Sequence, residues 1–162
     1  RDSLTGRYNR HFLEETLETE LNRAQRSGKS IGLIMLDLDH FKELNSVYGH
    51  PNVDQMLREF GAMLKRSIRS GDIACRYGGD EFLLILPETS IAIAQQRAEQ
   101  IRIQVKGLVI QGDNLEPRNA SASIGVACWP QHGKTSLRLL NIVDAALFKA
   151  KQGGGDQVVL AE

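Results

Sequence analysis

Acidic side chains follow two hydrophobic segments of the chain, in an arrangement that indicates metal chemistry. Residues 76–82 have the sequence Arg-Tyr-Gly-Gly-Asp-Glu-Phe, which places Asp80 and Glu81 after two glycines at the expected tip of a hairpin. Upstream, the buried-strand pattern of residues 31–36 ends in Asp37-Leu38-Asp39. Carboxylates at two strand ends can hold a hard divalent cation against a phosphate. The pattern therefore predicts divalent-metal chemistry on a nucleotide.

The composition limits the kinds of partner that this site can serve. The chain has 162 residues, of which 41% are hydrophobic and 25% are charged, as expected for one folded domain. Its 20 basic and 20 acidic residues give a formal net charge of +0. No global field therefore favours a nucleic-acid polymer or direct contact with an anionic membrane, and phosphate recognition must be local.

Cysteine usage and hydropathy predict a cytoplasmic domain. Cys75 and Cys128 lie far apart within apolar stretches, and no Cys or His spacing suggests a zinc site, so both are expected to be reduced core residues. No apolar run approaches the roughly 20 residues of a membrane span, and no signal peptide precedes Arg1.

The elements that must position these acids form an α+β pattern. A helix capped by Asn9 is expected to run to about Arg26, and a strand to cover Ile31 to Asp39. A short helix should start near Phe41, and a longer one after Gly49-His50-Pro51. The remaining expected elements are strands at Asp72–Tyr77 and Glu81–Leu86, a helix from Ser90 to about Lys106, strands at Leu108–Ile110 and Ser121–Trp129, a helix from about Leu139 to Gln152, and a strand at Gln157–Leu160.

Glycine-rich connections between neighbouring strands predict a mixed, largely antiparallel sheet flanked by helices. Gly78-Gly79 is expected to supply the positive φ angles of a tight hairpin turn, which would join the two strands on either side.

A series of short motifs runs through nearly the whole chain in a fixed order. The motifs are Asp2-Ser3-Leu4-Thr5-Gly6 with Asn9-Arg10, Asp37-Leu38-Asp39-His40-Phe41-Lys42, Asn45, Gly49-His50, Asp54, Gly78-Gly79-Asp80-Glu81-Phe82, Ser123-Ile124-Gly125-Val126-Ala127, and the segment from Asp144 to Lys151. Taken in order, they resemble those of the GGDEF domains, a family that acts as diguanylate cyclases, which condense two GTP into cyclic di-GMP with release of two pyrophosphates. The resemblance implies a palm-like, ferredoxin-related fold, and a single domain over residues 1–162 excised from a longer multidomain signalling protein.

For the metals, the resemblance implies two Mg²⁺ (or Mn²⁺) ions per active site. Asp37, the backbone carbonyl of Leu38, and Asp80 would be ligands, with Glu81 as a further ligand and Asp80 as a candidate to take the proton from the 3′-hydroxyl. The simpler alternative is that an acid at a strand end is only solvated, and Asp39 fits that alternative best.

For the substrate, the resemblance assigns residues to GTP. Lys42 would steady the charge that develops on phosphate, Phe41 would offer a backbone N–H, and Lys151 would contact the γ-phosphate. Gly78 and Gly79 would let the nucleotide lie against the backbone, and His50 would lie near it. Asn45 and Asp54 would read guanine, although both residue types also serve in turns and helix caps.

The segment Arg69-Ser70-Gly71-Asp72 matches the family's inhibitory R-x-x-D site, with five residues between it and Gly78. Arginine can hold phosphate bidentately or stack on guanine, so Arg69 and Asp72 are expected to bind cyclic di-GMP and stop turnover. The alternative is ordinary turn chemistry at the end of a helix.

Several positions depart from the family pattern. Val53 replaces a glycine, which would displace Asp54 unless the backbone there is helical. Gly155 stands where an arginine is expected, which would remove a phosphate contact. Ser46, Arg7 and Gln100 also differ, the last at a secondary inhibitory position.

These departures leave a second hypothesis open, a catalytically weak or silent module that binds GTP or cyclic di-GMP and regulates a neighbouring domain. An active cyclase would instead work as a homodimer, because each bound GTP must attack the other.

Overall fold

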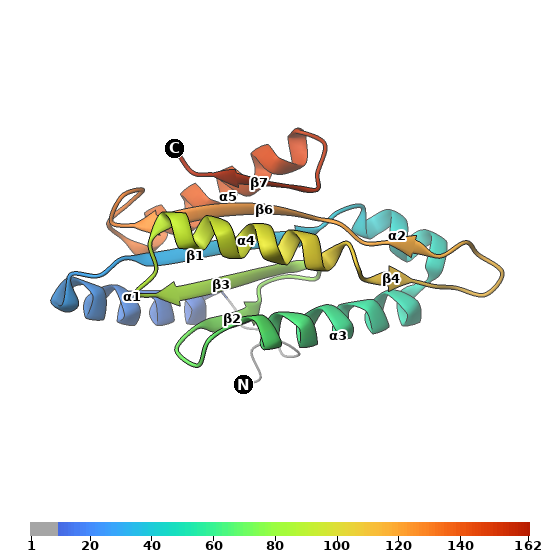
Figure 1. The fold of residues 1–162 in the computed structure, drawn as a ribbon, viewed down its shortest axis with the longest axis horizontal. Helices are drawn as coiled ribbons and strands as arrows, with labels where there is room; N and C mark the ends of the chain where they lie inside the picture. Colours follow the sequence, from blue (N-terminus) through green and yellow to red (C-terminus); the bar gives the residue numbers. More distant parts are fainter. Residues whose placement is uncertain (1–9) are drawn as a thin grey trace.

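A central mixed sheet organises the computed structural model, which describes residues 10–162 (Figure 1). Its strand order is β2-β3-β1-β6-β7, and every neighbouring pair is antiparallel except β6 and β7, which are parallel. The strands are β1 (Ile31–Leu38), β2 (Ile73–Arg76), β3 (Glu81–Pro87), β6 (Ala122–Trp129) and β7 (Gln157–Leu160). The predicted α+β class and mixed sheet are thus confirmed. The expectations that fall on residues 1–9 lie outside the described residues.

Helices cover both faces of this sheet. One face packs against α2 (Phe41–Tyr48), α3 (His50–Ser67) and α4 (Ile91–Val105), and the other against α1 (Arg10–Ser27) and α5 (Ser136–Gln152). Figure 1 shows α4 lying across the sheet, with α3 along one side of the molecule. Within residues 10–162, no helix is long and apolar enough to cross a membrane.

The central strand β1 is buried along its whole length, which explains its continuous apolar sequence. Because successive side chains of a strand point to opposite faces, Ile34 and Leu36 join the core under α3 and α4, while Leu33 and Met35 join the core under α1 and α5. Asp37 comes two residues after Met35, so its side chain points to the same face as Leu33 and Met35. The alternation therefore aims this carboxylate toward α5.

Local differences from the expected elements have identifiable causes. The helix α5 begins at Ser136, three residues before the predicted start, because the Thr135 side chain caps it by accepting a hydrogen bond from the Arg138 N–H (3.2 Å). A strand that the sequence analysis did not include, β5 (Arg118–Asn119), pairs with β4 (Val109–Ile110). Cys75 and Cys128 are free and buried, as predicted.

The hairpin turn was predicted wrongly in its backbone geometry. The glycines with positive φ among the described residues are Gly28, Gly49, Gly154 and Gly155, so neither Gly78 nor Gly79 uses that conformation. The connection spans the four residues between Arg76 and Glu81, and it is closed by hydrogen bonds from the Tyr77 and Gly78 N–H groups to the Glu81 carbonyl. A loop of this length does not need a two-residue turn with positive φ.

Candidate active site

The end of β1 carries the most buried carboxylate of the site. The side chain of Asp37 is 3% exposed, and it forms an ion pair with Lys151 from the last turn of α5. Since α5 covers the face to which Asp37 points, the sheet alternation and the helix together bring these two residues into contact. Lys151 Nζ binds Asp37 Oδ2, whereas Oδ1 is buried without a hydrogen-bond partner.

Asp80 from the hairpin tip is the second carboxylate at this point. It lines the same cavity as Asp37, and the Leu38 N–H donates to its backbone carbonyl (3.2 Å). Burial first, and then the neighbouring Asp80 carboxylate, raise the pKa of Asp37 to about 8, against the lowering effect of Lys151. Two carboxylates that compete for one neutralising charge, with one buried oxygen lacking a donor, fit a divalent cation.

These groups line a cavity of about 510 Å³ at the end of the sheet. The first turn of α2 forms one side, with Phe41 and the exposed Lys42, and no side chain caps that helix. The N–H groups of such a turn are available to an anion. The full lining consists of Asp37, Leu38, Asp39, His40, Phe41, Lys42, Glu43, Asp80, Lys151, Gly154 and Gly155.

Glu81 lines a neighbouring cavity of about 420 Å³ instead, together with Asp144 and Lys151. Burial raises the pKa of Glu81, Lys151 lowers it, and the charges of Asp144 and Asp80 raise it further. Within residues 10–162, no group of three or more His, Cys, Asp or Glu side chains is arranged to hold a metal ion. Magnesium is often bound by one or two carboxylates together with phosphate and water, and the Asp37–Asp80 pair suits that type of site.

The hairpin tip is fixed by an arginine to which the sequence analysis gave no role. Arg76 Nε donates to the carbonyls of Gly78 (3.2 Å) and Gly79 (3.1 Å). These bonds restrain the loop that carries Asp80, although neither glycine lines the larger cavity. The only sequence signal was the position of Arg76 directly before the tip.

The three residues expected near the base lie on α2 and α3, outside the lining of the cavity. Gly49 joins the two helices with a φ of 86°, which a side chain would disfavour. The side-chain oxygen of Asn45 is buried without a hydrogen-bond partner, while His50 and Asp54 are exposed in the first turns of α3.

Val53 does not distort this segment. It lies inside α3 with ordinary helical geometry and is fully buried in the core. The helical alternative stated for this position is therefore the one observed, and a glycine is not required there.

Asp39 is not merely solvated, contrary to the simpler expectation. Its carboxylate accepts hydrogen bonds from the hydroxyls of Ser121 (2.6 Å) and Ser123 (2.7 Å), and from the backbone N–H of Asp156 (2.9 Å). Gly155 lies directly against it. The residue is thus a junction between the ends of β1, β6 and the turn after α5.

The R-x-x-D segment forms the turn between α3 and β2. Arg69 donates to Asp72 through both its backbone N–H (2.9 Å) and its guanidinium (3.3 Å), and the guanidinium also donates to the Pro87 carbonyl (3.1 Å) and the Thr89 hydroxyl (2.9 Å). The side chain of Arg69 remains 57% exposed, whereas that of Asp72 is 1% exposed.

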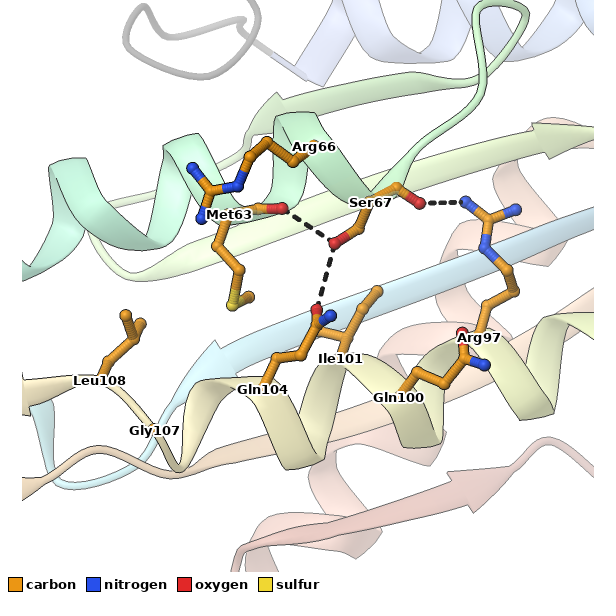
Figure 2. Close-up of a pocket in the computed structure, with 9 residues that line it drawn as sticks. All are labelled: Met63, Arg66, Ser67, Arg97, Gln100, Ile101, Gln104, Gly107 and Leu108. Carbon is orange, nitrogen blue, oxygen red and sulfur yellow. Dashed lines mark hydrogen bonds between the residues drawn. The ribbon is translucent and has the colours of Figure 1, made fainter.

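A second arginine completes this cluster from α4. Arg97 donates to Asp72 Oδ2 (3.1 Å) and to the carbonyl of Ser67 (2.9 Å). Figure 2 shows Arg97 reaching from α4 to Ser67 at the end of α3, with Gln100 one turn further along α4. Beside this contact, the space between α3 and α4 is a cavity of about 430 Å³, which is lined by Arg97 and Gln100 among others.

Known proteins with similar sequences point to the same family. The family model "Diguanylate cyclase, GGDEF domain" matches residues 1–157. The chain is 37% identical over 159 residues to the response regulator PleD of Caulobacter vibrioides, covering 98% of this chain and 35% of PleD. It is also 37% identical over 159 residues to diguanylate cyclase DosC of Escherichia coli, covering 98% and 34%. The chain thus spans about a third of the length of these relatives.

Solved structures agree with this assignment. The GGDEF domain of DgcB from Caulobacter crescentus, in complex with c-di-GMP, aligns with a TM-score of 0.89 at 31% identity, over 99% of this chain and 92% of that one. Diguanylate cyclase SiaD from Pseudomonas aeruginosa, in complex with its activator SiaC, aligns with a TM-score of 0.88 at 40% identity, over 99% and 61%. The motifs, the fold and these matches together place the chain in the GGDEF family of diguanylate cyclase domains.

Proposed function

We propose that this chain is an active diguanylate cyclase, which joins two GTP molecules into cyclic di-GMP and releases two pyrophosphates. The observation that carries the proposal is the Asp37–Asp80 pair beside Lys151, because a buried carboxylate oxygen without a hydrogen-bond donor could help hold a divalent cation. The family in general uses divalent metals, and Mg²⁺ or Mn²⁺ at this pair would neutralise the charge that accumulates on phosphate during the transfer.

The residues of the chain would share the work as follows. Asp37, Asp80 and the Leu38 carbonyl would hold the metals, with Glu81 contributing from the neighbouring cavity. Lys42, Lys151 and the first N–H groups of α2 would bind the phosphates. Lys151, which binds Asp37 in this structure, would bind a phosphate oxygen of GTP.

Each transfer forms a bond from a ribose 3′-oxygen to the α-phosphorus of the other GTP and breaks the bond to pyrophosphate. The hydroxyl proton would pass to the carboxylate of Asp80. Asn45 and Asp54 would accept hydrogen bonds from guanine N–H groups, with His50 nearby. Two transfers between facing domains close the ring, so a homodimer is the active form.

We propose that the product limits its own synthesis at Arg69. The exposed guanidinium can bind phosphate or stack on guanine, while Asp72, already held by Arg69 and Arg97, fixes the orientation of that arginine. In this arrangement Asp72 supports Arg69 more than it reads the base itself.

The decisive experiment is chromatography of the products formed from GTP and Mg²⁺ at high protein concentration. The wild type, Arg69→Ala and the matched control Arg58→Ala, from the exposed side of α3, would be compared after removal of bound nucleotide. We expect cyclic di-GMP from all three, with the most product from Arg69→Ala. Asp37→Asn should abolish product formation.

The second candidate function is a silent GTP- or cyclic di-GMP-binding module, and Gly155 in place of an arginine is the observation that favours it. Absence of product in every variant, with nucleotide binding retained, would replace the cyclase by this module. Equal inhibition of wild type and Arg69→Ala by added cyclic di-GMP would contradict the proposed inhibitory site and leave the cyclase proposal unaffected.

A further inference from the structure

The turn that follows α5 lies directly after Lys151, so its conformation bears on where this lysine sits in the cavity. Three consecutive residues of the turn have positive φ: Gly154 (108°), Gly155 (78°) and Asp156 (51°). Glycine segments lose more backbone entropy on ordering than other residues do, so the turn depends on contacts that hold it. Backbone hydrogen bonds tie it to α5, from the Gly154 N–H to the Lys151 carbonyl (3.2 Å) and from the Gly155 N–H to the Ala150 carbonyl (3.0 Å). Asp156 ties it to two other parts of the fold.

On one side the turn is tied to α4. The carboxylate of Asp156 binds Arg102 (2.8 Å) and Lys106 (2.7 Å), which leave it 31% exposed. These ion pairs are solvent-accessible, and exposed pairs of this kind contribute little to stability.

On the other side the turn is tied to Asp39, through the hydrogen bond from the Asp156 N–H. Both carboxylate oxygens of Asp39 are occupied, because the hydroxyls of Ser121 and Ser123 also donate to it. The Asp39 N–H in turn donates to the Ser121 carbonyl (2.9 Å). Asp39 thus accepts from three donors, one at Oδ1 and two at Oδ2, and it connects the ends of β1 and β6 to the glycine turn.

Gly155 lies so close to the Asp39 carboxylate that a side chain at this position would crowd it. A Cβ atom added at Gly155 would lie 3.0 Å from Asp39 Cγ and from both carboxylate oxygens, whereas a Cβ added at Gly154 would meet nothing within 4 Å. Only a residue without a side chain combines the positive φ with this close approach.

We propose that Asp39 is the positioning residue of the phosphate-binding turn. It accepts a hydrogen bond from the Asp156 N–H and packs against Gly155, and in this way it holds the turn so that Lys151 reaches the cavity beside Asp37. The proposal deepens the proposed function, on which its nucleotide-binding consequence rests.

The first test measures the turn itself, by hydrogen–deuterium exchange of residues 153–157 without nucleotide. Asp39→Ala should speed exchange there about ten-fold, the loss expected for a charged hydrogen bond to a backbone amide. Asp39→Asn should stay close to wild type, since its amide oxygen can accept from Asp156 while its NH₂ donates to a serine hydroxyl. Unchanged exchange in Asp39→Ala would overturn the proposal.

A second pair of variants tests the same contact from the glycine side and does not depend on Asp39 substitutions folding. Gly154→Ala and Gly155→Ala both place a side chain at positive φ, with the greater strain at Gly154 (108° against 78°), but only Gly155→Ala presses on Asp39. We expect faster exchange in Gly155→Ala than in Gly154→Ala. Equal exchange in the two variants would contradict the match between Gly155 and Asp39.

The nucleotide arm compares binding of GTP and GMP by calorimetry in Mg²⁺. Asp39→Ala and Gly155→Ala should weaken GTP binding about ten-fold and GMP binding much less, because Lys151 serves the terminal phosphates, and Asp39→Asn should bind GTP nearly as the wild type does. Equal losses in Asp39→Ala and Asp39→Asn would indicate a metal ligand and overturn the positioning role. If wild type bound no GTP, the proposed function would fail, while the exchange data would still decide the role of Asp39.

Discussion

Two buried oxygen atoms without donors distinguish the candidate site at the scale of single residues. Among the described residues, the buried side-chain polar atoms that lack a hydrogen-bond partner are Asp37 Oδ1, Asn45 Oδ1 and Trp129 Nε1. An unsatisfied buried polar group costs about 1–3 kcal/mol, and a ligand that supplies a donor or a cation recovers this cost as binding free energy. The residues expected to bind metal and guanine therefore carry a local instability that a nucleotide would relieve.

Asn45→Ala tests this trade-off. Removing the unpaired oxygen should leave the thermal midpoint unchanged or slightly raised, while the preference for GTP over ATP should fall about ten-fold, through the loss of one hydrogen bond to the base. Calorimetric titration with both nucleotides measures the preference, and scanning calorimetry measures the midpoint. Asn52→Ala, which removes an amide bonded to the Tyr48 carbonyl, is the matched control. An unchanged GTP preference in Asn45→Ala would remove Asn45 from the base site.

At the scale of the elements, the close contact of β6 with α5 determines how near the helix that carries Lys151 lies to the sheet. A Cβ added at Gly125 of β6 would lie 2.5 Å from the Leu147 backbone nitrogen and 2.6 Å from the Val143 carbonyl oxygen. Backbone atoms of a helix cannot yield as the end of a side chain can. The glycine of the Ser-Ile-Gly-Val-Ala motif is thus a packing requirement, and it places α5, and with it Lys151, against the sheet.

Gly125→Ala should therefore push α5 away from β6. We expect a loss of about 1–3 kcal/mol in the free energy of unfolding, which urea titration would measure, and a matching loss of GTP binding. Gly71→Ala is a suitable control, because a Cβ there would meet nothing within 4 Å and φ is not positive. A Gly125→Ala protein as stable as Gly71→Ala would show that α5 adjusts without cost.

At the scale of the whole molecule, one domain could bind only one of the two GTP molecules that the proposed reaction needs. The cavity at the end of β1 offers one carboxylate pair and two lysines, which suits one GTP, whereas the product needs two. In the proposed mechanism, the second nucleotide would come from another copy, whose approach the neutral overall charge of the chain does not oppose over long range.

The specific activity of the isolated chain should therefore rise with its concentration, and fusion to a dimerising coiled coil should make it high and nearly independent of concentration. Activity assays across a dilution series, with sedimentation of the same samples, measure both. Concentration-independent turnover by a strictly monomeric sample would contradict the dimer mechanism.

The sequence by itself determined the strands of the central sheet, and it indicated which acids to expect at the site. Alternation and apolar runs located β1, α3 and β6, because burial imposes those periods on any chain that folds this way. The hairpin carrying Asp80 and Glu81 followed from the glycine pair between two apolar runs. The ordered set of motifs was specific enough to indicate the family before any contact was known.

Only the tertiary structure decided how residues far apart in the chain combine. The ion pair of Lys151 with Asp37, the three donors to Asp39, and the contact of Gly155 with that carboxylate each join segments separated by many residues. Local patterns report which face of an element a residue occupies, but not which distant side chain it meets. For that reason the sequence alone suggested a solvated acid at Asp39 and only the loss of an arginine at Gly155, whereas the structure shows that the two residues pack against each other.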